Sequence, residues 1–184
     1  KEQLEVLHIL GRREEERASL EQLEANPAAP VFEVASLWGR YYEAIANYPD
    51  AEAAVERALA VSREEGPVVN QARALAQLGL IARQPGDYER AKDWYLQALA
   101  LFEDKEHHTD EESKVLIDAS NGLGTTYRQQ GEFDQTKSAY QRALTLSRQH
   151  SNLPGAAEAL GVVGLSSLPG FADRVYDLGL FRVR

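Results

Sequence analysis

A recurring order of small and large residues constrains this chain more than any other feature. Each copy opens with a Leu-Gly or Trp-Gly pair, and the glycines of the three copies are Gly39, Gly79 and Gly124. Each copy closes with an Ala-Leu pair 19 positions later, at Ala58, Ala98 and Ala143 (58 − 39, 98 − 79 and 143 − 124). The copies begin 40 and 45 residues apart (79 − 39 and 124 − 79). A period of this length indicates a protein built from structural repeats.

The residue pattern of each copy predicts two helices joined by a tight turn. Gly79 and Gly124 fall within the first helix, where glycine costs roughly 1 kcal/mol relative to alanine. Close packing of the second helix against the first can offset that cost. Gly86 and Gly131 come just before the second helix, where a left-handed residue ends one helix and turns the chain into the next. We therefore expect each copy to be a helical hairpin.

The middle copy, residues 72–105, resembles the tetratricopeptide repeat, whose signature joins Leu-Gly, Gly-x-Tyr and Ala…Tyr…Ala-Leu in this order. The third copy departs at Thr136, where the family prefers alanine, and the first has Ala46 where the others have the turn glycine. The long spacing is similar to that of the variety found in kinesin light chains and bacterial signalling ATPases. The resemblance implies an all-α fold, a right-handed superhelical solenoid of antiparallel helix pairs.

We expect one array over residues 1–184. Its expected parts are an N-terminal helix and linker (1–30), repeat 1 (31–66), repeat 2 (67–108), repeat 3 (109–151) and a divergent repeat 4 or C-terminal cap (152–184). The spacing of leucines predicts one long helix over 2–25, ended by Pro27. The repeats predict helix pairs at 31–46 and 49–64, 67–84 and 87–104, and 110–130 and 133–149. Thr109 and Glu112 have capping-box spacing at the start of the fifth of these helices.

The C-terminal segment departs from the pattern. Leu160-Gly161 repeats the opening pair, and Pro169-Gly170 supplies a turn, so we expect a divergent hairpin of about 153–167 and 170–181. The tail at 170–184 is rich in apolar residues and lacks the polar outer face of a cap. We expect it to pack either on the fourth helix pair or on a second copy of the chain. The second arrangement would form a homodimer through the solenoid ends.

Charge and composition exclude several classes of function. The formal net charge is −9, from 29 acidic and 20 basic residues, and no basic patch is visible, so we expect neither nucleic acid nor membrane as a partner. No apolar run approaches the roughly 18 residues that a membrane span needs. The chain has no cysteine and therefore no disulfide or thiolate metal site. We expect a soluble, cytoplasmic protein and, because the sequence opens at Lys1 inside a periodic segment, a fragment of a longer chain.

A search for catalytic chemistry is negative. The sequence has no phosphate-binding loop, no dinucleotide-binding motif, no zinc-protease motif and no nucleophile elbow. His107 and His108 stand near carboxylates, but adjacent residues of a helix point in different directions and the segment has the composition of a solvated connector. We therefore expect no catalytic residue, no metal site and no cofactor.

The resemblance implies that peptides bind along the first helices of successive repeats, on the concave face. With the marker glycine counted as the eighth position, positions two, five, nine and twelve form the inward stripe. The candidate peptide-binding residues on it are Arg40, Arg73, Leu80, Arg83, Asn121, Thr125 and Arg128. The lysine and asparagine clamp of the family's chaperone-binding members is not reproduced here. Arg83 and Arg128 also lie in the last turn of a helix, where a cation is favoured by the helix dipole whatever binds.

The sequence therefore favours a non-catalytic protein-interaction scaffold that binds an acidic or extended peptide of a partner protein in this groove. Two alternatives stay open. One is a regulatory or sensor array of a larger signal-transduction ATPase or transcription regulator, and the other is a self-association module.

Overall fold

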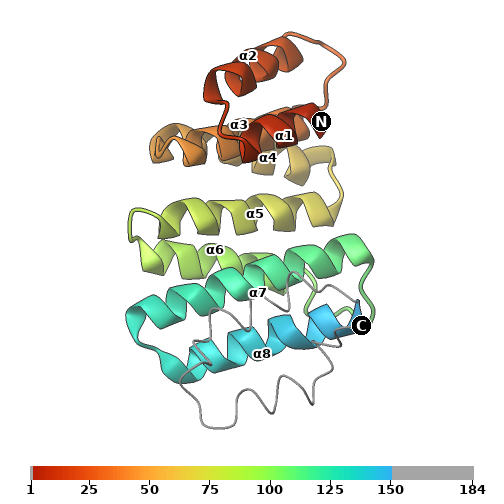
Figure 1. Ribbon diagram of the computed structural model, residues 1–184. Helices are drawn as coiled ribbons and strands as arrows, with labels where there is room; N and C mark the ends of the chain where they lie inside the picture. Colours follow the sequence, from red (N-terminus) through yellow and green to blue (C-terminus); the bar gives the residue numbers. More distant parts are fainter. Residues whose placement is uncertain (1, 151–184) are drawn as a thin grey trace, which may run out of the picture. The chain divides into compact units, whose positions relative to one another are not determined.

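The computed structural model of the protein describes residues 2–150. This part contains eight helices and no strand: α1 (Glu2–Ile9), α2 (Arg13–Glu24), α3 (Val31–Ala44), α4 (Tyr48–Glu65), α5 (Val68–Arg83), α6 (Tyr88–Ala100), α7 (Asp110–Gln130) and α8 (Phe133–Gln149). They belong to two compact units, one over Lys1–Leu101 with α1 to α6 and one that starts at Phe102 with α7 and α8 (Figure 1). The expected fourth hairpin and the tail at 170–184 lie outside the described residues.

The same left-handed turn joins the two helices of every hairpin in the described chain. Its central residues have positive φ, namely Gly11 (67°), Ala46 (57°), Gly86 (93°) and Gly131 (78°). In each turn the next amide donates to a carbonyl five residues back, as Asp87 N does to Ala82 O at 3.1 Å. These bonds satisfy the last carbonyls of the first helix and direct the chain back antiparallel to it. The predicted turn glycines Gly86 and Gly131 are thereby confirmed.

The prediction of one long helix over 2–25 is wrong, because Gly11 makes the same turn and separates α1 from α2. A buried carboxylate stabilises the corner. Glu16 is only 4% exposed, and its oxygens lie 2.7 Å from His8 Nδ1 and 2.5 Å from Arg13 Nη1. The charged residues of this segment therefore include a buried carboxylate that pairs across a hairpin.

The marker glycines lie where the two helices of a hairpin approach each other most closely. An ideal Cβ on Gly79 would lie 2.8 Å from the ring of Tyr95, and one on Gly124 would lie 2.9 Å from the ring of Tyr140. Gly39 has the same relation to Val55, whose Cγ2 would be 2.3 Å away. The expectation that a missing side chain permits close helix packing is confirmed for Gly79 and Gly124, and the structure shows the same at Gly39.

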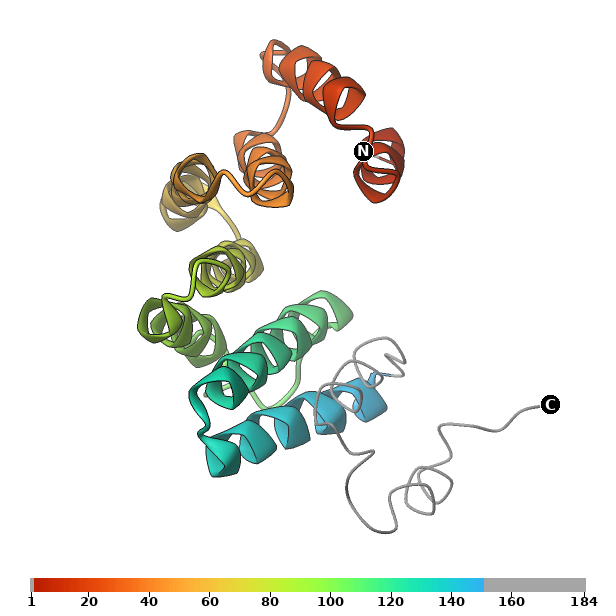
Figure 2. The same cartoon turned by 60° about the vertical axis from the view of Figure 1, so that its left-hand side comes forward.

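Within the first unit the helices form two layers. Viewed end-on, α3 and α5 lie on one side and α4 and α6 on the other (Figure 2). Gln77 Nε2 donates to the carbonyl of Ser36 at 3.0 Å and thereby holds α5 beside α3. In the other layer Arg90 of α6 forms an ion pair with Glu52 of α4.

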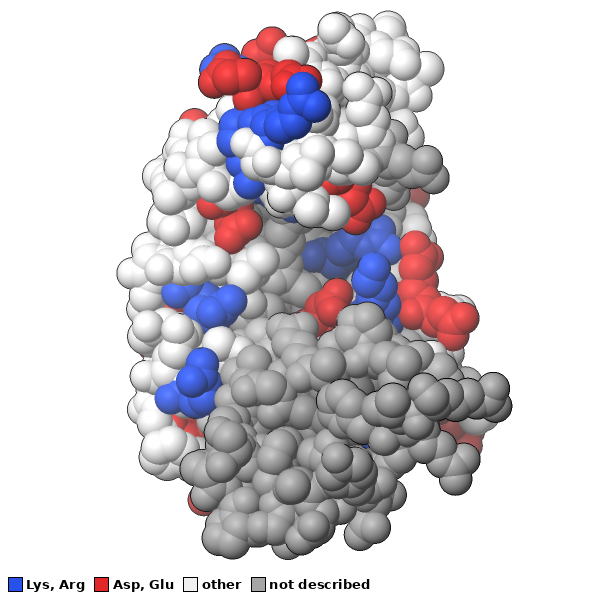
Figure 3. Space-filling view, in the orientation of Figure 1, with Lys and Arg blue, Asp and Glu red and all other residues white. Residues whose placement is uncertain are grey.

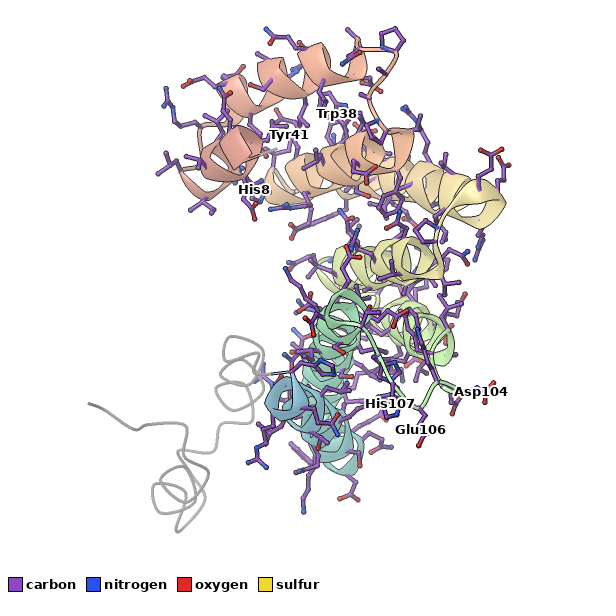
Figure 4. The ribbon with its side chains drawn as sticks, turned by 90° about the vertical axis from the view of Figure 1, so that its right-hand side faces the viewer. His8, Trp38, Tyr41, Asp104, Glu106 and His107 are labelled. Atoms are coloured by element: carbon purple, nitrogen blue, oxygen red, sulfur yellow. The ribbon has the colours of Figure 1, made fainter. Side chains whose placement is uncertain are left out.

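The N-terminal hairpin packs on α3 through an aromatic cluster. Trp38 and Tyr41 project from α3 toward α1 and α2 (Figure 4), where they meet the buried side chains of Leu4 and Leu20. The indole of Trp38 donates to Glu24 Oε2 at 2.9 Å, which satisfies its one polar group. This hairpin therefore covers the apolar surface that the first repeat would otherwise expose.

The second unit begins with a connector that leads into α7. The predicted capping box is confirmed: Thr109 Oγ1 accepts from the amide of Glu112 at 3.3 Å, and the carboxylate of Glu112 accepts from the amide of Thr109 at 2.9 Å. The preceding helix α6 ends at Ala100, four residues before the predicted end at 104. Helix α7 spans 21 residues and ends at Gln130, as predicted, with the left-handed Gly131 as its cap.

Candidate functional site

The candidate site in the first unit is the surface of α3 and α5 that carries the predicted stripe. We call it the α3–α5 face, and its residues are Glu33, Ser36, Arg40, Glu43, Arg73, Ala76, Leu80 and Arg83. All eight are half-buried, as expected for side chains that line a face between helices rather than a core. The helical spacing of the stripe therefore places its four candidate residues of this unit, Arg40, Arg73, Leu80 and Arg83, on the surface of two neighbouring helices.

Two side-chain hydrogen bonds lie at this face, one between the two helices and one within α5. Gln84 Nε2 donates to Glu43 Oε1 at 3.0 Å, close to the C-terminal ends of α3 and α5. Near the other end of α5, Arg73 Nη1 donates to Asn70 Oδ1 at 3.2 Å. Glu43 and Arg73 are thus engaged with neighbouring side chains before any ligand arrives.

Two arginines of the face differ from Arg73. Among residues 2–150, the side chains of Arg40 and Arg83 make no hydrogen bond and no ion pair. The Nε atom of Arg83 and the hydroxyl of Ser36 are moreover buried without a hydrogen-bond partner in this part of the chain. Buried polar atoms of native proteins are nearly always paired, so unpaired donors on one face need an explanation.

The second unit presents its three candidate residues differently. Asn121 is completely buried in α7, so its side chain is not on an open surface. Thr125 is half-buried, and its hydroxyl lies 3.0 Å both from the carbonyl of Asn121 and from the phenol of Tyr140. Arg128 is exposed near the C-terminal end of α7. Helical spacing alone did not reveal that Asn121 and Thr125 serve packing within the hairpin.

Charge on the visible surface is mixed. Figure 3 shows basic and acidic side chains interspersed over the described residues on the side of the molecule that it presents, with no continuous basic patch among them. The connector residues Asp104, Glu106 and His107 are spread along the chain without converging on one point (Figure 4). Within the described part of the chain no cluster of His, Asp or Glu could hold a metal ion. Over the same residues, none of the helices has the length and apolar character that a membrane span requires.

Comparison of the sequence with protein families gives two matches to one family. Models of the tetratricopeptide repeat match residues 31–104 and residues 117–150. The first match covers the α3–α4 and α5–α6 hairpins, and the second runs from within α7 to the residue after α8. No curated protein matches the sequence.

Two solved structures illustrate the similarity of fold. BtubC (BKLC) from P. vanneervenii has a TM-score of 0.65 and 20% sequence identity, over 97% of this chain and 74% of that one. Aspartyl phosphate phosphatase F from Bacillus subtilis has a TM-score of 0.75 and 17% identity, over 97% of this chain and 49% of that one. The chain thus spans about half the length of the phosphatase. At these identities the likeness establishes the helical solenoid fold alone, so the name of the phosphatase assigns no activity to this chain.

Proposed function

Because the chain belongs to the tetratricopeptide repeat family, we propose that it is a non-catalytic protein-interaction scaffold whose α3–α5 face binds an extended, acidic segment of a partner protein. Repeats of this family are in general protein-interaction modules. The proposal rests on the first unit alone, with Arg40, Arg73, Leu80 and Arg83 as the contact residues.

The observation that carries the proposal is the set of unpaired donors on this face. Arg40 and Arg83 carry positive charge without a partner in the described chain, and Arg83 Nε and Ser36 Oγ are buried without an acceptor. A guanidinium binds carboxylates and peptide carbonyls through charge-assisted hydrogen bonds. Leu80 lies half-buried on the same face and offers an apolar contact. An extended segment with acidic and apolar side chains matches both kinds of group.

Selection from a random-peptide display library against the full chain tests the proposal. We expect the selected peptides to be enriched in aspartate and glutamate and to bind less tightly as salt is added, because salt screens exposed charge pairs. Arg83→Ala should weaken a selected peptide by up to about fivefold, and the double change with Arg40→Ala should weaken it further, since an exposed ion pair contributes roughly 0–1 kcal/mol.

Arg63→Ala is the matched control. Arg63 is exposed on α4, in the other layer of the same unit, and among the described residues it makes no hydrogen bond or ion pair. Calorimetric titration should give the same affinity for this variant as for the parent. Selected peptides that bind the Arg40 and Arg83 double variant as tightly as they bind Arg63→Ala would rule out the α3–α5 face as the binding site.

A further inference from the structure

The second unit contains an open cavity that the proposed function does not use. It has a volume of about 500 Å³, within the range of roughly 300–1,000 Å³ typical of small-molecule sites. Its lining comes mainly from one side of α8, with Ser138, Gln141, Arg142, Thr145 and Leu146. Helix α7 adds Leu116, and the connector before α7 adds His108. All of these residues belong to a single compact unit.

The cavity combines an apolar part with a small number of polar groups. Leu116 and Leu146 are 0% and 9% exposed and supply the apolar part. The hydroxyls of Ser138 and Thr145 donate to carbonyls of their own helix, at 3.1 Å and 2.9 Å. Their protons are therefore engaged, and the groups left to donate to a ligand come from the other polar residues of the lining.

Arg142 gives the cavity a positive charge. None of the described residues that line the cavity carries a carboxylate. Two acidic residues close in sequence to His108 bind other side chains: Glu112 binds Lys105 Nζ at 2.7 Å, and Asp110 binds His150 Nδ1 at 3.2 Å. The side chain of Arg142 is exposed and makes no hydrogen bond or ion pair within residues 2–150. A guanidinium without a partner can bind an anion through charge-assisted hydrogen bonds.

His108 adds a second unpaired group at the rim of the cavity. Its ring packs edge-on against Phe102 with the centroids 6.2 Å apart, and its Nδ1 is buried without a hydrogen-bond partner in the described structure. Burial lowers the pKa of His108, with smaller opposing and reinforcing effects from Glu112, Lys105, His150 and Arg142. The imidazole is therefore neutral near pH 7, and in the tautomer with a proton on Nδ1 it donates to an anion.

We propose that this cavity binds a carboxylate attached to a short branched apolar group, with the carboxylate on Arg142 and His108 and the apolar group on Leu116 and Leu146. This inference is independent of the α3–α5 face, which lies in the other unit. The same chemistry is offered by a free organic acid and by a glutamate flanked by leucines in a partner protein.

Nuclear magnetic resonance titration of the full chain with 4-methylpentanoate tests the proposal, and 4-methylpentanamide is the uncharged control of the same shape. We expect the acid to shift the amide resonances of Gln141 and Arg142 and the imidazole resonances of His108. The amide should bind more weakly by up to about fivefold, because it cannot form an ion pair with the exposed guanidinium of Arg142.

Arg142→Gln should weaken binding of the acid by up to about fivefold for the same reason. Arg148→Gln is the matched control, since Arg148 is exposed on the same helix and lies outside the cavity lining. Both substituted side chains are exposed, and far-ultraviolet circular dichroism confirms that each variant is folded.

A second pair of probes, the capped tripeptides Leu-Glu-Leu and Leu-Gln-Leu, separates the two sources of the carboxylate. Tighter binding of the glutamate peptide than of the free acid assigns the cavity to a partner protein. Tighter binding of the free acid assigns it to a small acid.

Three results would overturn the proposal. Equal binding of 4-methylpentanoate and its amide would show that the charge is not recognised. Shifts confined to residues outside the lining would place the ligand elsewhere. Equal affinities of Arg142→Gln and Arg148→Gln, or no shift with any probe, would show that Arg142 does not bind a carboxylate.

Discussion

Gly79 is the residue whose smallness matters most for the second repeat, because the ring of Tyr95 occupies the space where a side chain would begin. We expect Gly79→Ala to lower the free energy of unfolding by about 1–3 kcal/mol through overpacking, although alanine is intrinsically the better helix former. Urea unfolding of the full chain measures the change.

A double-mutant cycle with Tyr95→Leu locates the strain. Replacing the ring removes the atoms that a Cβ at position 79 would approach within 3 Å, so Gly79→Ala should cost less in that background. If the cost is the same in both backgrounds, the close approach to Tyr95 does not limit residue size at this position.

Ala46 is the one residue other than glycine that has a positive φ in the described chain, at 57°. It makes the turn that glycine makes at Gly11, Gly86 and Gly131. A left-handed conformation costs a residue with a Cβ roughly 1–2 kcal/mol. Part of this cost is offset because an unfolded chain with alanine is less flexible than one with glycine and loses less entropy on folding. We expect Ala46→Gly to raise the free energy of unfolding by about 0.5–1 kcal/mol, measured by urea titration.

Ala60→Gly is the matched control for this gain. Ala60 is exposed within α4, where backbone dihedrals are helical and glycine destabilises by about 0.5–1 kcal/mol. The same substitution should therefore have opposite signs at the two positions. A loss of stability in both variants would contradict the assignment of strain to Ala46.

At the scale of single elements, α7 is the helix whose start is most clearly defined. Thr109 and Glu112 exchange two hydrogen bonds at its first turn, and Glu112 also binds Lys105. We expect Thr109→Ala to lower the free energy of unfolding by about 1 kcal/mol, as for other lost N-caps. Thr109→Ser keeps the accepting oxygen and should stay close to the parent in thermal unfolding. A Thr109→Ser variant as unstable as Thr109→Ala would mean that the hydroxyl is not the stabilising group.

Also at this scale, the three predicted hairpins and the N-terminal segment show how far sequence reasoning reaches. Gly86 and Gly131 identified their turns because each stands between two amphipathic stretches. Gly11 has the same role, but the charged residues after it continue the helical spacing and conceal the break. The end of α6 was misplaced because no glycine or proline follows Ala100 to mark it.

At the scale of the whole molecule, stability in a repeat protein is approximately a sum over neighbouring units. The α1–α2 hairpin is the terminal unit of the described chain, and it covers Trp38 and Tyr41. We expect deletion of residues 1–30 to lower the melting temperature and shift the tryptophan fluorescence to longer wavelength, while the remaining helices stay folded by circular dichroism.

Two point substitutions test the same interface without truncation. Leu20→Ala removes a side chain that is 1% exposed and should cost about 2–5 kcal/mol. Val6→Ala removes one that is 52% exposed on α1 and should be nearly neutral. Collapse of all helical signal on deletion of 1–30 would contradict the additive description of this chain.

The sequence by itself determined the helical class, the three hairpins and the helix faces, because these follow from local properties. Helical periodicity places Arg40 on the same face of α3 as Arg73 and Arg83 occupy on α5. A turn glycine ends a helix wherever it stands. Only the tertiary structure decided which of these side chains lack partners. Pairing depends on atoms brought from distant parts of the chain, as Tyr140 is brought to Thr125 and His108 to the stripe of α8 that carries Arg142. The local sequence does not encode which distant residues come into contact. Only these contacts show that Arg40 and Arg83 have side chains without partners in the described chain, whereas Asn121 is buried.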